Sequence, residues 1–442
     1  MEPLFDLPPE ESKQAKGIGQ PRVERANRYQ VAMRISSLDE MLPAEHRARI
    51  VWEMVQGYDL DWFYDRIEAI EGEAGRPAID PKLLMAVWLY ATLEGVGSAR
   101  ALARLCEEHI AYQWILGGVT VNYHTLADFR VRYERQLDRI LTQSVAALMN
   151  EGIVTLEQVS QDGMRVRASA GGGSFSKRSK LEKYLDQAKE HVERLKQEQD
   201  KGEMGKTNKR VQSARKRQAR ERLERIQQAL EELEKVEKQK AKSCDKKKRA
   251  KPACSSTTDP EARIMRMPDG GFRPAHNAQL AVDTDSRLIV GVDMINAVDQ
   301  GQMSRMVTQI EERYAIKPQE YFVDGGFVTN NEIETVAQKG ITIYAPLPEP
   351  RRPGSQPGQP KSGDGSGLRE WRIRMNTEAA KEHYRLRAET VEWANALARN
   401  RGLYQLRVRG LQKTRAVLLW YALAHNLMQV FALRECSFSY CS

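Results

Sequence analysis

The stretch Tyr321-Phe322-Val323-Asp324-Gly325-Gly326-Phe327 decides the fold. Its first three residues are apolar strand formers, and Asp324 follows them directly with a Gly pair behind it. The stretch Ser160-Gln161-Asp162-Gly163-Met164-Arg165-Val166-Arg167-Ala168 places Asp162 in a second strand pattern. An Asp before a Gly is commonly a turn residue, so neither acid alone carries much weight. Together they predict two strands that each present one carboxylate.

A third carboxylate, Glu392, lies on a basic helical stretch 68 positions after Asp324, which itself lies 162 positions after Asp162. Only a tertiary fold could bring the three together. Oxygen ligands suit Mg²⁺, a hard ion. In phosphoryl transfer, two such ions about 4 Å apart activate the attacking oxygen and stabilise the leaving one. The three acids therefore predict an acidic metal site that cuts nucleic acid.

The sequences around these acids resemble those of DDE transposases of bacterial insertion sequences, of the insertion-sequence-five kind. In that family the first Asp lies in a D-G-x-x-hydrophobic strand, as in residues 162–166, and the second in D-x-G-[YF], as in residues 324–327. The resemblance covers most of the chain, from about residue 35 to about residue 432. The third acid of the family belongs to a Tyr, Arg, Glu, Lys/Arg series on a helix, which is matched here by Tyr384, Arg387, Glu392 and Arg399.

This resemblance implies an RNase H-like catalytic domain in which Asp162, Asp324 and Glu392 are catalytic and hold two Mg²⁺ ions, with Mn²⁺ able to substitute. In such a domain we expect the strand ending at Asp324 to lie beside the strand that bears Asp162. The resemblance also implies hydrolysis at the ends of an insertion sequence and attack of the released 3′-hydroxyl on target DNA. Arg387 and Arg399 would hold phosphates, and Tyr384 would stack or hydrogen-bond beside the cut strand. The implied partners are double-stranded DNA and a second copy of the chain, with neither a membrane nor a small-molecule substrate.

The third motif departs from the family pattern in its spacing. Four residues separate Arg387 from Glu392, where related groups have three, and Glu389 offers a competing carboxylate. On a straight α-helix with Tyr384 at zero, Glu392 falls at about 80° and Arg399 at about 60°. Arg387 falls at about −60° and Glu389 at about 140° on the same helix. We therefore prefer Glu392 as the third carboxylate and interpret Glu389 as a solvated helix charge.

The basic surplus of the chain lies in one insert, residues 176–252. It carries 26 Lys and Arg against 14 Asp and Glu, whereas the rest of the chain carries 43 against 46. Apolar residues recur at heptad spacing from Leu181 to Leu195 and again from Leu223 to Leu233, which predicts an antiparallel, coiled-coil-like helical hairpin. We expect the hairpin to grip DNA phosphates or a second protomer; the alternative is a solvated helical appendage. The cations predicted to bind DNA are Lys209, Arg210, Arg215, Lys216 and Arg217.

The remaining chain divides by its periodicity, and the whole predicts a mixed α+β protein. Residues 35–150 read as a helical bundle, with a helix capped by Ser98 and another from Leu126 to Leu148. This bundle resembles the N-terminal region of the same transposases and is expected to bind the ends of the element. Residues 151–175 and 253–432 form the predicted catalytic domain, in which 276–283, 288–293 and 341–345 are strands. The Pro-, Gly- and Ser-rich residues 346–367 predict a flexible linker, and 1–34 and 433–442 are tails.

Other acids and the five cysteines stay outside the predicted site. Asp283 and Asp285 are interpreted as turn residues, and Asp299 and His276 are left out of the catalytic set. The cysteines lack CxxC spacing, which argues against a zinc site and a disulfide framework and fits a reducing cytoplasm. The resemblance implies that this is a bacterial cytoplasm, near the nucleoid. No secretory signal and no run of about 18 apolar residues was recognised, so no membrane is expected.

Two rival functions remain from the sequence. A DNA-binding regulator, or an inactivated transposase copy, would explain the basic hairpin but leave the three acids without a purpose. A metal-dependent nuclease without strand transfer would need the same acids. Metal dependence separates the regulator from both enzymes, and the joining of a cut end to new DNA separates the transposase from the nuclease.

Overall fold

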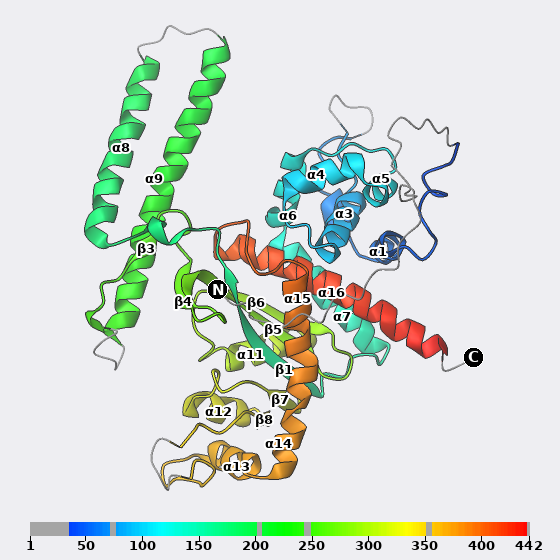
Figure 1. Cartoon of the computed structure of the whole chain (residues 1–442), viewed down its shortest axis with the longest axis vertical. Helices are drawn as coiled ribbons and strands as arrows, with labels where there is room; N and C mark the ends of the chain where they lie inside the picture. The colour runs from blue at the N-terminus through cyan, green and yellow to red at the C-terminus, as the bar shows by residue number, and fades with distance from the viewer. Residues whose placement is uncertain (1–34, 71–76, 201–205, 243–248, 351–355, 440–442) are drawn as a thin grey trace, which may run out of the picture.

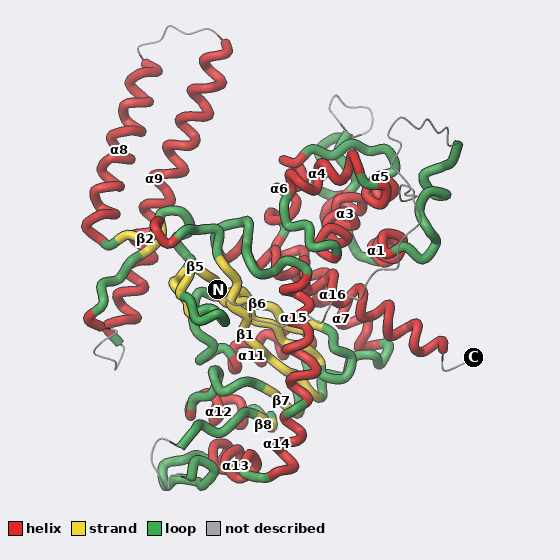
Figure 2. Tube along the Cα trace, viewed as in Figure 1, coloured by secondary structure: helices red, strands yellow, loops and turns green. Residues whose placement is uncertain are grey.

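The computed structural model describes residues 35–70, 77–200, 206–242, 249–350 and 356–439. The predicted tail 1–34 and the end of the predicted tail 433–442 lie outside these residues. Figure 1 shows three parts: a bundle of helices, a long helical hairpin, and a sheet with its own helices between and below them. Figure 2 shows that the strands gather in the middle of the molecule and that helices surround them.

The N-terminal bundle is built from helices that begin at polar caps. The Asp80 carboxylate accepts a hydrogen bond from the Lys82 amide, and the Ser98 hydroxyl accepts one from the Ala101 amide, as the sequence predicted for Ser98. The helix predicted over 126–148 is instead two helices, because Tyr133 leaves the helical conformation (φ −112°, ψ 39°) and packs against an aromatic cluster. The helices are α1 (Arg47–Gln56), α2 (Asp61–Tyr64), α3 (Pro81–Leu93), α4 (Ala99–Glu108), α5 (Ile110–Leu116), α6 (Tyr123–Arg132) and α7 (Glu134–Asn150).

The central sheet is mixed and has the order β4-β5-β1-β7-β8, with β6 paired to β5. The three long strands β1, β5 and β6 pair antiparallel with one another, whereas β7 and β8 run parallel to β1. Ser160 on β1 pairs with Phe322 on β7, so the strands of Asp162 and Asp324 are neighbours, as predicted. The strands are β1 (Gln158–Arg167), β4 (Arg263–Arg266), β5 (Phe272–Asp283), β6 (Ile289–Ile295), β7 (Glu320–Phe322) and β8 (Thr342–Tyr344).

Helices on the C-terminal side carry the third motif and close the core. The long helix α16 (Leu411–Ser439) runs between the bundle and the sheet, where the Trp420 indole donates to the Arg130 carbonyl (3.0 Å). Residues 411–434 of α16 are apolar enough to cross a membrane by length and composition, with mean hydropathy 1.5, but 72% of that apolar window is buried inside the protein. The remaining helices are α11 (Met303–Tyr314), α12 (Asn330–Ala337), α13 (Ser366–Met375), α14 (Glu378–Tyr384), the π-turn η2 (Ala388–Glu392) and α15 (Trp393–Asn400).

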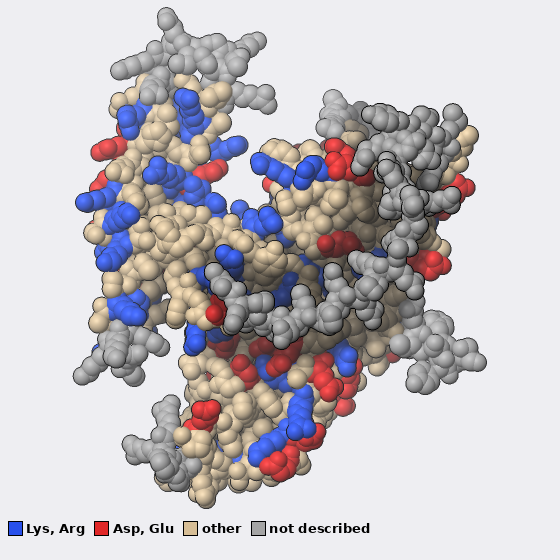
Figure 3. Space-filling model, viewed as in Figure 1, with Lys and Arg blue, Asp and Glu red and all other residues tan. Residues whose placement is uncertain are grey.

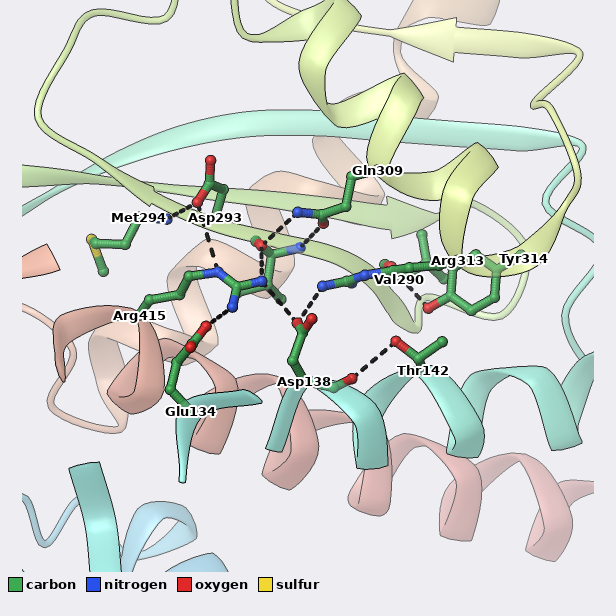
Figure 4. A network of polar contacts seen from close by, with 11 residues as sticks. Glu134, Asp138, Thr142, Val290, Asp293, Met294, Gln309, Arg313, Tyr314 and Arg415 are labelled. Carbon is green, nitrogen blue, oxygen red and sulfur yellow. Dashed lines mark hydrogen bonds and ion pairs between the residues drawn. The ribbon is translucent and has the colours of Figure 1, made fainter. Parts of the chain in front are cut away.

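A buried ionic network joins the bundle to the sheet (Figure 4). Arg415 on α16 contacts Glu134 and Asp138 of α7, the latter at 2.8 Å. Arg313 of α11 contacts the same Asp138 and donates to the Val290 carbonyl of β6 (3.2 Å). Because the network draws on α7, α11, α16 and β6, it fixes the bundle against one face of the sheet.

The basic insert forms two long antiparallel helices, α8 (Arg178–Asp200) and α9 (Lys206–Ala241). Leu181 and Ala188 on α8 and Ile226 and Leu233 on α9 are buried, so both apolar seams lie in the interface between the two helices. At its base the chain enters and leaves through a two-stranded ribbon, β2 (Phe175–Ser176) with β3 (Ser255–Ser256).

The second half of the predicted linker is packed against helices α12 and α13. Residues 351–355 lie outside the described chain, but Asp364 forms a buried ion pair with Arg372 (2.8 Å). Arg372 also donates to the Pro357 carbonyl (2.7 Å), and Glu334 of α12 accepts from the Leu368 amide (3.0 Å). Residues 356–367 are therefore packed and not the flexible segment that was expected, because the buried Arg372 contacts both Pro357 and Asp364.

Candidate functional site

Two acids lie level with each other on neighbouring parallel strands. Asp162 lies on β1, where its side chain is 18% exposed, and Asp324 follows β7 and accepts a hydrogen bond from the Gly326 amide (2.8 Å). Burial raises the pKa of the Asp162 carboxyl, and the nearby negative charge of Asp324 adds to that rise. Arg387 and a hydrogen bond from Asn395 oppose the rise without cancelling it. The fold has thus placed two carboxylates close enough to repel each other.

Arg387 joins the first and third motifs. Its guanidinium lies 2.8 Å from an Asp162 oxygen and 2.5 Å from a Glu392 oxygen, and its side chain is only 8% exposed. Burial lowers the pKa of Arg387, but the charges of Asp162, Tyr384, Asp324 and Glu392 outweigh burial and raise it overall. All three predicted carboxylates therefore surround one buried cation, which the sequence assigned to DNA phosphates.

The contact between Arg387 and Glu392 corrects the helical projection. On a straight α-helix these residues would point about 140° apart. Residues 388–392 instead form a π-turn, which holds one more residue than an α-turn and so brings Glu392 back beside Arg387. The extra residue between Arg387 and Glu392 is thus absorbed by the backbone. Glu389 lies within the same turn and is exposed.

The other two members of the third motif have different surroundings. The Tyr384 hydroxyl donates to the carbonyl of Val323, the residue before Asp324 (3.1 Å). Tyr384 is half-buried and ties the end of α14 to the end of β7. Arg399 is exposed in the last turn of α15. Of the two, Tyr384 lies at the site through an internal contact, whereas Arg399 faces solvent.

Sequence reasoning missed two polar anchors beneath the carboxylates. The Asn395 amide donates to the second oxygen of Asp162 (2.8 Å), three residues after Glu392. The Thr390 hydroxyl lies 3.0 Å from the Ser160 hydroxyl on β1 and 2.9 Å from the Leu386 carbonyl oxygen. Their positions shortly after Arg387 in the third motif are the signal in the sequence that could have marked them. In the structure, both side chains reach β1 from the π-turn and the helix that follows it.

Gly163 has a steric reason to follow Asp162. A Cβ atom at this position would clash with the side chains of Asp299, Gln279 and Asn277, which would have to move to make room for it. Asp299 is buried and accepts from Asn277 (2.7 Å) and Gln279 (2.9 Å), and it pairs with Arg165 (3.0 Å). Asp299 therefore supports the strands around the site. His276, also outside the catalytic set, is fully buried against Asp259 (3.1 Å).

The donor chemistry of the site fits a divalent metal ion, because carboxylate oxygens are the ligands that Mg²⁺ prefers. The three acids do not form a metal-binding cluster in this structure. Among the described residues, no group of three His, Cys, Asp or Glu lies close enough to hold a metal ion. Arg387 lies between Asp162 and Glu392, so a metal bound by both acids would require this guanidinium to move.

The predicted DNA-binding cations lie on α9. Arg215 and Arg217 are exposed, and the Arg217 side chain lies 3.8 Å from Glu221 one turn away. The side chains of Lys209 and Arg210 lie outside the described part of the structure, and Lys216 is partly buried. Figure 3 shows Lys and Arg distributed along the hairpin and on the bundle surface across from it.

Two protein families match the chain. Transposase domain (DUF772) matches residues 36–132, which span α1 to α6, and Transposase DDE domain matches residues 366–431, which include Arg387, Glu392 and Asn395. No curated protein and no solved structure matches the chain. Transposases act on DNA, and a DDE domain implies an enzyme that cuts and joins it, generally with divalent metal ions. Together with a carboxylate pair on neighbouring strands and a glutamate bridged to it, these matches support a DDE transposase of an insertion sequence.

Proposed function

We propose that the chain binds the ends of its insertion sequence, hydrolyses the terminal phosphodiester and joins the 3′-hydroxyl to target DNA by two-metal-ion phosphoryl transfer. The observation that carries this proposal is the convergence of Asp162, Asp324 and Glu392 around Arg387 from three distant segments. The strand order supports an RNase H-like catalytic domain, because its first three strands are antiparallel and two parallel strands follow beside β1.

Each side chain at the site has a task in this proposal. Asp162, Asp324 and Glu392 would hold two Mg²⁺ ions, or Mn²⁺ in their place, and the ions would activate an attacking oxygen and stabilise the leaving one. Asn395 orients Asp162. Tyr384 holds the end of β7 so that Asp324 faces Asp162. Arg387 is a buried counter-charge that would turn toward a DNA phosphate, and Arg399 would contact the same strand from solvent.

The surrounding parts would hold the DNA. The exposed cations of α9 fit phosphate contacts, because Lys and Arg outnumber Asp and Glu by 26 to 14 in the insert but not in the rest of the chain, which carries 43 against 46. The N-terminal bundle would read the element ends, and a second copy of the chain would hold the other end in a homodimer. The protein would work in the bacterial cytoplasm, at the nucleoid.

The test is Mg²⁺-dependent cleavage of a plasmid that carries the gene with its native flanking DNA. Asp324→Asn removes one charge from the site and keeps the hydrogen-bond acceptor for Gly326, so the variant should fold and bind DNA but not cleave. Asp285→Asn is the matched control, because Asp285 is an exposed acid in the turn between β5 and β6 and should leave cleavage unchanged.

The outcomes separate the rival functions. Cuts at the flanks that vanish in Asp324→Asn, followed by joining to new DNA, support the transposase. Cuts without joining would identify a nuclease, and tight DNA binding without cleavage by the wild-type protein would identify a regulator or an inactive copy.

A further inference from the structure

A cavity of about 350 Å³ lies between the helical bundle and the catalytic part of the molecule. Gly95, Gly97 and Arg130 line it from the bundle, and Arg407 and Tyr421 line it from the C-terminal part. Both family matches therefore contribute to one cavity, since 36–132 contains the first group and 366–431 contains the second. None of the described residues that line it is an Asp or a Glu.

The cavity is anchored to the strand that carries Asp162. The Arg167 amide at the end of β1 donates to the Tyr404 carbonyl (3.0 Å), and the Leu406 amide donates back to the Arg167 carbonyl (2.8 Å). Arg167 lies five positions after Asp162, so along a strand the cavity begins at roughly 15–20 Å from the carboxylates. A DNA strand that reaches the acids could therefore also reach this cavity.

Arg130 forms the inner wall and is held as a charged group without a carboxylate. Arg130 is 9% exposed. Its guanidinium donates to the Gly97 carbonyl (2.6 Å) and lies 4.8 Å from the centre of the Trp88 ring. Its Nε atom is buried and has no hydrogen-bond partner. Burial lowers the pKa of Arg130 to about 10, so the group still carries its charge at neutral pH.

A second cation, Arg407, meets Arg130 over Gly97. A Cβ atom at Gly97 would lie 3.8 Å from the Arg407 Nε and 3.9 Å from an Arg130 terminal nitrogen, so both guanidinium groups approach the same point. Arg407 is exposed, and its charge further lowers the pKa of Arg130. Helix α4 begins two residues later at Ala99, which adds the partial positive charge of a helix N-terminus. Two like charges brought together at a helix start favour an anion between them.

We propose that this cavity, the Arg130–Arg407 pocket, binds a phosphate group of the DNA backbone. Two guanidinium groups match the geometry and charge of a phosphodiester, and the missing side chain at Gly97 lets the phosphate approach the backbone. The exposed ring of Tyr404 at the rim offers a surface for the adjoining sugar or base. This inference rests on the proposed function only in that the chain must bind DNA.

The first experiment measures binding of a fluorescein-labelled duplex from the gene's flanking DNA by anisotropy over a range of salt concentrations. Arg407→Gln should weaken binding and reduce the slope of log K against log salt by about 0.9, the value for one phosphate. Arg139→Gln is the matched control, because Arg139 is 62% exposed on α7 and lies 3.7 Å from Asp59 rather than in the pocket. An unchanged slope in Arg407→Gln would overturn the inference while leaving DNA binding, and the proposed function, intact.

The second experiment replaces single phosphates of the duplex by uncharged methylphosphonates. One position should weaken wild-type binding and have no further effect on Arg407→Gln, because the variant no longer holds that phosphate. If every position weakens both proteins equally, the pocket does not hold a backbone phosphate. If no duplex binds the wild-type chain, the proposed function fails as well, which distinguishes the two failures.

The third experiment tests a free anion as the source. Inorganic phosphate should raise the melting temperature of the wild-type protein little at millimolar concentration, since a site for DNA gains most of its affinity from neighbouring contacts. A strong stabilisation by inorganic phosphate that is absent in Arg407→Gln, together with an unchanged DNA salt slope, would make the pocket a small-anion site and overturn the assignment to DNA.

Discussion

At the scale of single residues, Asp162 lies in surroundings that favour its neutral form. Burial is the largest cause of its raised pKa, and Asp324 contributes in the same direction. A carboxyl whose pKa is higher in the folded chain stabilises that chain while protonated, and this contribution is lost as the pH rises from its ordinary value of 3.8 through the folded pKa. At neutral pH the ionised Asp162 therefore costs stability.

Asp162→Asn should accordingly melt at the same temperature as the wild type at pH 7, or at a higher one, while it abolishes metal-dependent cleavage. The difference in melting temperature should shrink as the pH is lowered toward 4, because the wild-type carboxyl then becomes protonated. Calorimetry at several pH values checks this. A variant that melts clearly below the wild type at pH 7 would mean that the attraction to Arg387 outweighs burial.

The sequence predicted the separate acids better than it predicted their counter-charge. Asp324 directly follows the apolar strand β7 and Asp162 lies within β1, and the resemblance of both segments to transposase motifs was enough to expect neighbouring strands. The burial of Arg387 and the role of Asn395 depend on how α14 and α15 lie over β1, which no local pattern encodes. Asp299 is a similar case, since its effect on Gly163 arises across a sheet.

At the scale of elements, the π-turn η2 determines which face of the helix meets Asp162. Its one additional residue makes Arg387 and Glu392 neighbours, so removal of that residue should leave an ordinary α-turn with the same pair in contact. Deletion of Ala388, which is exposed, should therefore retain folding and a substantial part of the cleavage activity.

Deletion of Ala396 is the matched control for this prediction. Ala396 is an exposed alanine in the regular helix α15, where loss of one residue rotates everything beyond it by about 100°. This deletion should lower the melting temperature and reduce activity more than deletion of Ala388. Equal losses in the two deletions, measured by thermal melting and plasmid cleavage, would show that the π-turn is not a tolerated insertion.

The basic hairpin makes a second prediction at this scale. Replacement of Arg215, Lys216 and Arg217 by Gln should lower DNA affinity for every sequence alike, and the salt slope should fall by about 0.9 for each phosphate that the variant no longer neutralises. If the hairpin binds ~6–10 phosphates in total, wild-type affinity should fall by about 10³–10⁵ between 50 and 200 mM salt. Anisotropy titrations measure both. A salt response that the triple variant leaves unchanged would reduce the hairpin to a solvated appendage.

The two heptad seams and the break in the helix at Tyr133 show where elements can and cannot be predicted. Leu181 and Leu233 repeat at a regular spacing, so the sequence identifies the interface that they form. Tyr133 lies in a sequence that favours a continuous helix, and the break depends on aromatic partners such as Phe63, which lies 70 residues earlier. Tertiary packing therefore overrides local preference at that position.

At the scale of the whole molecule, the network around Arg415 holds the bundle to the sheet. Arg415 is 18% exposed, and burial lowers its pKa, while the pKa of its partner Asp138 is raised by burial against the attraction of Arg313. Removal of one member of a buried ionic network leaves the others charged and unpaired. The intact network therefore changes the free energy of unfolding little, but the loss of one member should lower it strongly.

Arg415→Ala should destabilise the protein by about 3–5 kcal/mol, since Glu134 and Asp138 lose a buried partner. Arg434→Ala on the same helix is the matched control: its pair with Glu151 is about half exposed on both sides, and its loss should cost about 0–1 kcal/mol. Guanidinium unfolding of the two variants measures the difference. Similar unfolding midpoints would show that the network does not hold the two parts together.

The narrow base of the hairpin has a consequence for how these proteins diversify. β2 and β3 bring the two ends of residues 177–254 to adjacent positions. The arm therefore constrains the central sheet no more than a short surface loop would. Whole heptads could be added to or removed from both helices in matching pairs without shifting a single strand. The reach of the arm along DNA is therefore free to evolve, and to be engineered, independently of the chemistry at the carboxylates.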